Sequence, residues 1–442
     1  MGTGTAATDR YGNALGTSSP AAARHYNDGM DRYLSGGAGH EAAMEAAATA
    51  DEGFALAHVA LARFNQFRGR MREATAGARR ARELAAGITR REQQHIEVIA
   101  TAIEGQPMRA LALVKEHVQD YPTDAFVTAQ ASGVYGLIGF GGSTGRNEEQ
   151  LDLLAPLAPA YGDDWWYLTT LAFAENECFL HDRAREHVER SLQLEWRNGH
   201  AAHTMAHVSF ETGDVHEGAG FLAEWRQGYD RQAQMHGHLA WHHALFELLQ
   251  GSLDTVDTLY RQELSPGSST STALGLIADA ASLLWRRDLA GEALDGDWAE
   301  LRDFAATAFQ RPGMMFADVH CALAYAAAGD DARLGTLIDQ LRERAAAGKI
   351  AGGEVVPALA EAIAAFSHDD FARCITILEP LQPQVIRVGG SHAQREVFED
   401  TLLEAYCRAG RFEAAEELLK ERVERRVTPR DQAWLDRIRT AA

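Results

Sequence analysis

Residues 199–230 read GHAAHTMAHVSFETGDVHEGAGFLAEWRQGYD, and this stretch decides the fold. Apolar and small residues recur at helical spacing on both sides of Gly213, which predicts two helices joined by a short turn. The segments 164–195 and 237–264 have the same arrangement, and Gly251 marks the turn of the later one. A repeated pair of helices is therefore expected at the centre of the chain.

The period of this pattern is that of the tetratricopeptide repeat. Ala172 and Ala206 lie 34 residues apart, and Ala206 and Ala244 lie 38 apart. A helix–turn–helix unit of about 34 residues is the signature of that repeat, and its small residues let neighbouring helices pack closely. Weaker copies occupy 53–86, 314–345 and 396–424. We expect an all-α, tetratricopeptide-repeat-like helical solenoid, with residues 1–19 as an N-terminal arm and residues 20–442 as a single array that is most distinct at 164–264.

The bulk composition excludes several classes of partner. The chain has 442 residues and a formal net charge of −21, so a basic face for nucleic acid or anionic membrane is not expected. Its four cysteines are scattered and form no CxxC pair, which favours a reducing compartment. The N-terminal residues lack the apolar core of a signal peptide, and no apolar run approaches the length of a membrane span. We expect a cytoplasmic protein that contacts neither nucleic acid nor membrane, and the sequence does not indicate its oligomeric state.

Histidines gather on the first helices of adjacent repeats, which in this repeat class line the concave surface. One stripe, with members at i, i+3, i+7 and i+11, consists of His200, His203, His207 and Glu211. The next repeat sends His238 and Trp241 in the same direction, with His242 beside them, whereas His243 falls on the packing side. The preceding repeat contributes Trp166, Thr169, Phe173 and Asn176. A shared groove with histidine and aromatic walls is expected.

Such a groove favours the binding of a small ligand. Imidazoles exchange protons near neutral pH, so His203, His207, His238 and His242 are candidates for acid–base roles. The alternative is that they are hydrogen-bonded spacers between repeats. The spacing His203-x3-His207-x3-Glu211 also suits a transition metal, but it is not HExxH and the ligands would have to come from two helices. The prediction therefore assigns no metal and no cofactor, with a transition metal as the less favoured interpretation.

The chain resembles the tetratricopeptide repeat protein 38 family. The resemblance lies in His203-x3-His207 with Glu211-Thr-Gly213, in His238-x2-Trp241-His242, and in the segment 389–396, GGSHAQRE. It implies a helical-repeat protein and transfers no catalytic residue. The segment 389–396 adds a further expectation, because two glycines and a serine before a helix can cradle an anion. There His392 is a candidate acid–base residue and Ser391, Gln394 and Arg395 are candidate ligand-binding residues, unless the last two only tie the final repeats together.

Two functions follow from these patterns. The first is the binding of a small polar or anionic molecule in the histidine- and aromatic-lined cavity, with acid–base catalysis as an extension. The second is a protein-interaction scaffold that holds a peptide in the same groove, which is the common role of this repeat class. Histidines and aromatics, rather than lysine and asparagine, occupy the expected concave stripe, and this favours the small ligand.

Overall fold

The computed structural model describes residues 7–291 and 297–441, and over these residues it is helical throughout, with a single isolated bridge between Thr8 and Ala14 in place of any strand. The N-terminal helices are α1 (Pro20–Leu34), α2 (His40–Ala50), α3 (Ala55–Phe67), α4 (Met71–Leu84), α5 (Arg90–Ile103), α6 (Pro107–Asp120) and α7 (Ala125–Ala131). The central helices are α8 (Arg146–Leu154), η1 (Ala155–Leu157), α9 (Ala158–Tyr161), α10 (Trp165–Glu177), α11 (His181–Leu194), α12 (Gly199–Thr212), α13 (Val215–Trp225), α14 (His236–Gln250), α15 (Leu253–Leu259) and η2 (Tyr260–Leu264).

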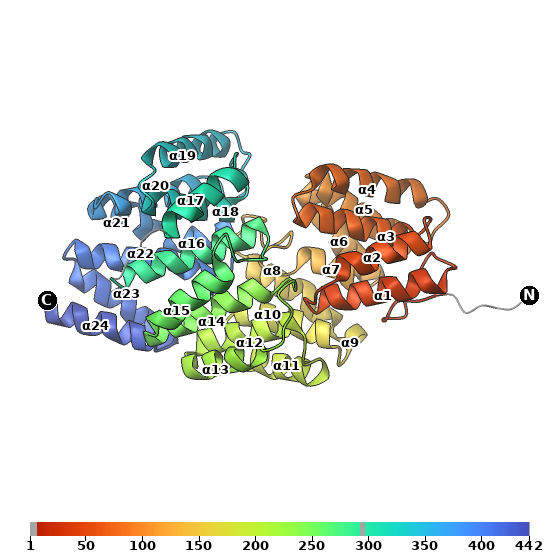
Figure 1. Cartoon of the computed structure of the whole chain (residues 1–442), viewed down its shortest axis with the longest axis horizontal. Coiled ribbons are helices and arrows are strands. Elements are labelled where there is room, and N and C mark those ends of the chain that lie inside the picture. Colours follow the sequence, from red (N-terminus) through yellow and green to blue (C-terminus); the bar gives the residue numbers. More distant parts are fainter. Residues whose placement is uncertain (1–6, 292–296, 442) are drawn as a thin grey trace, which may run out of the picture.

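The C-terminal part continues the series of helices. It contains α16 (Ala273–Leu289), α17 (Asp297–Ala308), α18 (Met315–Ala327), α19 (Asp331–Ala346), α20 (Val355–Ser367), α21 (Phe371–Leu381), η3 (Gln382–Val388), α22 (His392–Arg408), α23 (Phe412–Arg425) and α24 (Pro429–Ala441). Over most of the described residues, successive helices pair through short turns (Figure 1). The expected all-α, tetratricopeptide-like architecture is confirmed.

Capping residues begin and end the central helices at the positions that the sequence predicts. The Asn198 side chain accepts the backbone N–H groups of His200 and Ala201 and so starts α12. Gly213 ends α12 with φ +79°, and Gly251 ends α14 with φ +81°, a left-handed conformation that favours glycine. Both predicted turns are therefore confirmed.

Small residues let the paired helices approach closely. Ala172, Ala206 and Ala244 are completely buried, as the repeat pattern predicts. Gly218 on α13 faces Phe246 on α14, and a β-carbon at position 218 would lie 2.4 Å from that ring. Any side chain at this position would therefore force the two helices apart.

The array closes on itself instead of remaining an open superhelix. Helix α22 packs against α16 and also touches α12, while α24 contacts α14. In the buried interface between α16 and α22, Arg286 on α16 forms an ion pair with Asp400 on α22 at 3.3 Å. On the N-terminal side, the backbone N–H of Gly199 donates to the carbonyl of Ser35 at 2.7 Å. The inner helices α10, α12 and α14 are consequently enclosed from both ends of the chain.

A glycine-rich loop between α7 and α8 crosses to the C-terminal helices. Arg146, which is fully buried, donates to the carbonyls of Gly139 and Gly390. Arg387 donates to the carbonyl of Gly142 at 2.9 Å. The segment 139–146 therefore links the N-terminal helices to the C-terminal helices.

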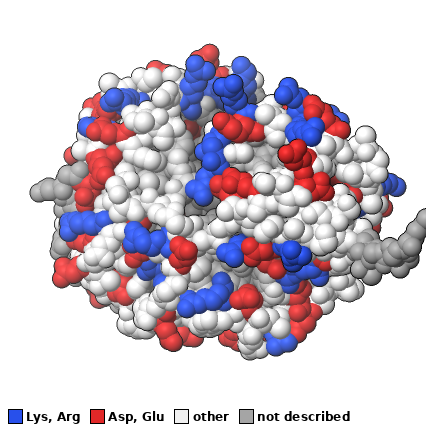
Figure 2. Space-filling view, turned by 45° about the vertical axis from the view of Figure 1, so that its right-hand side comes forward, with Lys and Arg blue, Asp and Glu red and all other residues white. Residues whose placement is uncertain are grey.

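The described part of the N-terminal arm is anchored to the repeats. Gly16 donates its N–H to Glu92 at 2.6 Å, and Arg10 pairs with Asp164 at 2.6 Å. Residues 1–6 of the expected arm lie outside the described residues. None of the helices in the described ranges is both long and apolar enough to cross a membrane. On the face in Figure 2, acidic and basic side chains are interspersed, without a broad patch of one sign.

Candidate functional site

Four histidines from two adjacent first helices converge on one point. His203 and His207 lie one turn apart on α12, and His238 and His242 lie one turn apart on α14. The Nε2 atom of His203 lies 2.9 Å from Nε2 of His207 and 3.1 Å from Nε2 of His238. One ring nitrogen from each of the four lies within 4.8 Å of those of the other three. We call this group the histidine tetrad.

Aromatic rings enclose the tetrad on two sides. Phe173 on α10 stacks on His203 with ring centroids 5.6 Å apart, and its edge meets His207 at 5.2 Å. Trp241 on α14 stacks on His238 at 5.3 Å. Its indole N–H donates to the hydroxyl of Ser282 on α16 at 3.1 Å, which fixes the ring. The predicted aromatic walls therefore come together with the histidines.

A carboxylate that the sequence pattern did not predict accepts a hydrogen bond from one of the four rings. Asp279 on α16 lies 2.9 and 3.0 Å from Nδ1 of His238. Because a carboxylate accepts hydrogen bonds, it selects the tautomer with its proton on Nδ1 and turns Nε2 toward His203. A lone acidic residue in the apolar stretch LGLIADAASLLW was the available signal, since a buried carboxylate needs a partner.

Burial keeps most of these imidazoles neutral. His207 and His242 are completely buried, whereas His203 and His238 are partly exposed. Burial, followed by repulsion from the other histidines, lowers the pKa of His203 and of His242 well below the ordinary value. Burial also lowers the pKa of His207 to about 3. These three rings are therefore expected to be neutral near pH 7, each with a lone pair on one nitrogen, and their acid–base roles stay a prediction.

Several polar atoms of this inner face have no hydrogen-bond partner among the described residues. They are Nδ1 of His207, both ring nitrogens of His242, and the amide nitrogen of Asn176. Buried polar atoms are nearly always paired, because leaving one unpaired costs about 1–3 kcal/mol. The unpaired ring nitrogens of His207 and His242 therefore single out the tetrad, whereas Asn176 lies apart from it.

The GGSHAQRE segment does approach the histidine helix. Nδ1 of His392 lies 2.9 Å from a carboxylate oxygen of Glu211, which is one turn beyond His207 on α12. Burial alone would raise the pKa of Glu211, but the His392 ring outweighs it and lowers the pKa to about 2. Burial lowers the pKa of His392, but Glu211 and Glu396 together raise it above the ordinary value. Arg425 completes the contact by approaching Nε2 of His392 at 3.1 Å.

The expected anion cradle at the start of α22 already holds an anion of the protein itself. The backbone N–H of His392 donates to both carboxylate oxygens of Glu177, at 3.3 and 3.2 Å. Ser391 and Gln394 form a reciprocal capping box. Arg395 donates to the carbonyl of Gly390 and lies 3.9 Å from Glu177. The backbone of His392 and the side chain of Arg395 thus connect α22 to α10, and ligand binding by Ser391, Gln394 and Arg395 stays a prediction.

Three other predicted site residues lie apart from the tetrad. Trp166 packs in the N-terminal hydrophobic core and meets the ring of Tyr161. His200 lies against Gly36, and burial lowers its pKa to about 4. Asn176 accepts from His181 through its side-chain oxygen at 2.9 Å. The predicted site residues therefore do not all meet: some belong to the tetrad, and the others pack against neighbouring elements.

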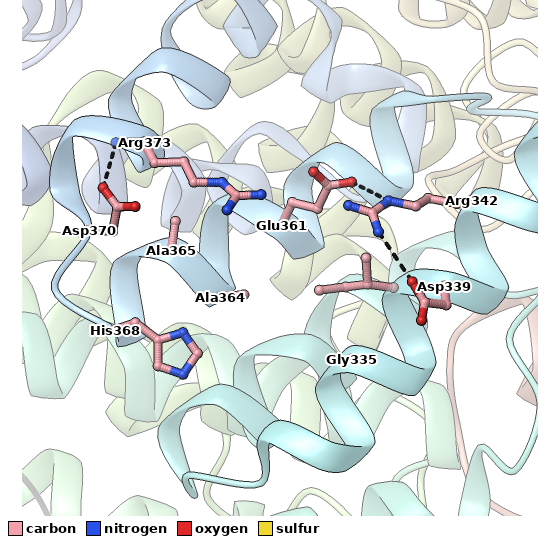
Figure 3. Close-up of a pocket in the computed structure, with 10 residues that line it drawn as sticks. Gly335, Asp339, Arg342, Glu361, Ala364, Ala365, His368, Asp370 and Arg373 are labelled. Atoms are coloured by element: carbon pink, nitrogen blue, oxygen red, sulfur yellow. Dashed lines mark hydrogen bonds and ion pairs between the residues drawn. The ribbon is translucent and has the colours of Figure 1, made fainter.

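A separate surface pocket lies between α19, α20 and α21 (Figure 3). Arg342 points toward Glu361 and pairs with it at 2.8 Å, and it also contacts Asp339 at 3.2 Å. Asp370 caps the start of α21 by accepting the backbone N–H of Arg373. Because most of the charges drawn there are paired with one another, this pocket is a weaker candidate than the tetrad.

No family model matches the sequence. Among solved structures, the human IFIT1 dimer with m7Gppp-AAAA is 13% identical, with a TM-score of 0.39, over 84% of this chain and 90% of that chain. Yeast Tom70 is 12% identical, with a TM-score of 0.32, over 95% of this chain and 94% of that one. The structure of Naa15/Naa10 bound to HypK-THB is 14% identical, with a TM-score of 0.25, over 91% of this chain and 63% of that one. These low values transfer no function to the chain.

Proposed function

We propose that this helical-repeat protein binds a small polar or anionic molecule at the inner face built by α10, α12 and α14. The observation that carries the proposal is the set of unpaired, buried ring nitrogens on His207 and His242. They lie beside the partly exposed rings of His203 and His238. A bound molecule would satisfy these nitrogens, and Phe173 and Trp241 would form its apolar walls.

The alternative is a scaffold that binds a peptide or protein partner, and the helical-repeat architecture supports it. The closure of the array by α22 and by the loop before α8 favours the smaller ligand, since an extended peptide needs an open groove.

The proposal includes the finer expectations from the sequence: kinship with the tetratricopeptide repeat protein 38 family, a single array over 20–442, and a cytoplasmic location.

Thermal denaturation in the presence of small carboxylates, phosphates and neutral polar metabolites tests the proposal. A ligand present at 100 times its Kd is expected to stabilise the native chain by about 2.7 kcal/mol. The variant His203→Gln should lose this stabilisation, while the matched control His243→Gln should retain it. His243 is one residue from the tetrad but faces Arg226 and Glu247.

The scaffold alternative predicts a different result for the same experiment: a captured peptide in place of a stabilising small molecule. If no small molecule stabilises the native chain, and a peptide that it captures is released by His203→Gln, the small-ligand proposal is wrong. Stabilisation that persists unchanged in His203→Gln would place the ligand elsewhere on the molecule.

A further inference from the structure

We infer that the histidine tetrad is a binding site for a divalent transition-metal ion such as Zn²⁺, with His203, His207, His238 and His242 as its ligands. The inference lies at the site of the proposed function but depends only on the ring nitrogens. It also revises the sequence-based assignment, which placed no metal here.

The separations of the ring nitrogens suit a single ion. Tetrahedral zinc with Zn–N bonds of about 2.0–2.1 Å holds its ligand nitrogens about 3.3–3.4 Å apart. The two shortest contacts, from Nε2 of His203 to Nε2 of His207 and of His238, are 2.9 and 3.1 Å. One ring nitrogen from each of the four histidines lies within 4.8 Å of those of the other three. A small movement of the side chains therefore brings the nitrogens to bonding positions around one ion.

Hydrogen bonds among the rings do not explain the arrangement. A neutral imidazole nitrogen offers either one N–H or one lone pair, yet Nε2 of His203 faces two other ring nitrogens. His242 contributes a ring whose two nitrogens have no partner among the described residues. Four lone pairs directed at one cation would satisfy the ligand nitrogens together, which pairwise hydrogen bonds cannot do.

The surroundings have the features of a metal site. Asp279 orients His238 through Nδ1, as carboxylates commonly do for metal-bound histidine, and leaves Nε2 free for the ion. The walls of Phe173 and Trp241 restrict water around the rings. Imidazole suits zinc, copper, nickel and cobalt, whereas magnesium and calcium prefer oxygen ligands. The site is therefore expected to discriminate between these two groups of ions.

Calorimetric titration of the full chain with ZnCl₂ tests the inference. The protein is expressed without a histidine tag and stripped with a chelator. The unsubstituted chain should bind one Zn²⁺ per chain, with no comparable binding of Mg²⁺. Asp279→Asn should raise the Kd about 10- to 100-fold, because the residue orients a ligand without being one. His242→Gln should raise the Kd further, and His243→Gln on the same helix should leave it unchanged.

Folding of each variant is checked by circular dichroism. If His242→Gln does not fold, the partly exposed His203 provides the second ligand variant, His203→Gln. Absence of stoichiometric Zn²⁺ binding by the unsubstituted chain, or equal affinity in the ligand variants, overturns the inference. Zinc binding without stabilisation by any small molecule keeps the metal site and removes the proposed function. Stabilisation of the metal-free chain by a small molecule, without zinc binding, does the reverse.

Discussion

At the scale of single residues, the tetrad combines histidines of α12 and α14 with a carboxylate, Asp279, of α16. Helical spacing placed His203 and His207 on one face, and repeat alignment brought His238 and His242 beside them. The role of Asp279 depends on α16 packing beside α14, which no local spacing reveals. Glu177 likewise acts at the start of α22, 215 residues away along the chain. Residues on the first helices of adjacent repeats were thus predictable, and their partners from other elements were not.

A carboxylate outside the tetrad gives a pH-dependent prediction. Asp318 on α18 is buried, and burial raises its pKa to about 7 from 3.8, although the N–H of Gly313 donates to it and Arg344 is nearby. A raised pKa means that the folded state holds this proton more tightly than the unfolded state. Stability is therefore lost as pH rises from about 4 to about 7.

Replacement of Asp318 by asparagine removes this ionisation and retains an oxygen that can accept from Gly313. We expect Asp318→Asn to stabilise the chain by about 2 kcal/mol more at pH 8 than at pH 5. Urea denaturation at the two pH values measures the difference. An equal change in the free energy of unfolding at both values would contradict this interpretation of Asp318.

At the scale of elements, several helical pairs were predictable because their turns carry a glycine. Gly213, Gly251, Gly329 and Gly410 all adopt the positive φ expected of a glycine that ends a helix. The partner of the N–H groups at the start of α22 could not be predicted in this way. A Gly-Gly-Ser sequence before a helix exposes N–H groups to any anion, and the sequence alone cannot tell a ligand from Glu177.

Two glycines allow the energetic cost of backbone conformation to be measured separately from the cost of close packing. Gly390 and Gly410 have φ of +73° and +69°, but only at Gly390 would a β-carbon meet a neighbour, 2.3 Å from the ring of Phe316. Both alanine variants should lose about 1 kcal/mol through the backbone. Gly390→Ala should lose a further 1–3 kcal/mol, roughly, through overpacking. Equal losses in urea denaturation would show that the contact with Phe316 relaxes freely.

At the scale of the whole molecule, closure of the array was the feature that the sequence could not predict. The contact of Arg286 with Asp400 joins residues 114 positions apart, and that of Arg146 with Gly390 joins residues 244 apart. Repeat periodicity describes neighbours in sequence and carries no information about such distant partners. This is why the sequence predicted a shared groove without indicating that α22 and the loop before α8 would cover it.

Closure predicts how the chain unfolds. The hydrophobic core divides mainly into an N-terminal cluster within residues 15–174 and a larger cluster within 202–438. Because Arg146 and the loop before α8 join the two halves, calorimetry should show one unfolding transition. Arg146→Met should separate it into two. Two transitions in the unsubstituted chain would mean that the halves are independent domains.

The central claim, that the four histidines bind one metal ion, is tested most directly by X-ray absorption spectroscopy of the zinc-loaded chain. The account predicts four nitrogen neighbours at about 2.0–2.1 Å, with the outer-shell scattering of imidazole rings. A spectrum dominated by oxygen neighbours, or one that is the same for His242→Gln as for the unsubstituted chain, would contradict it.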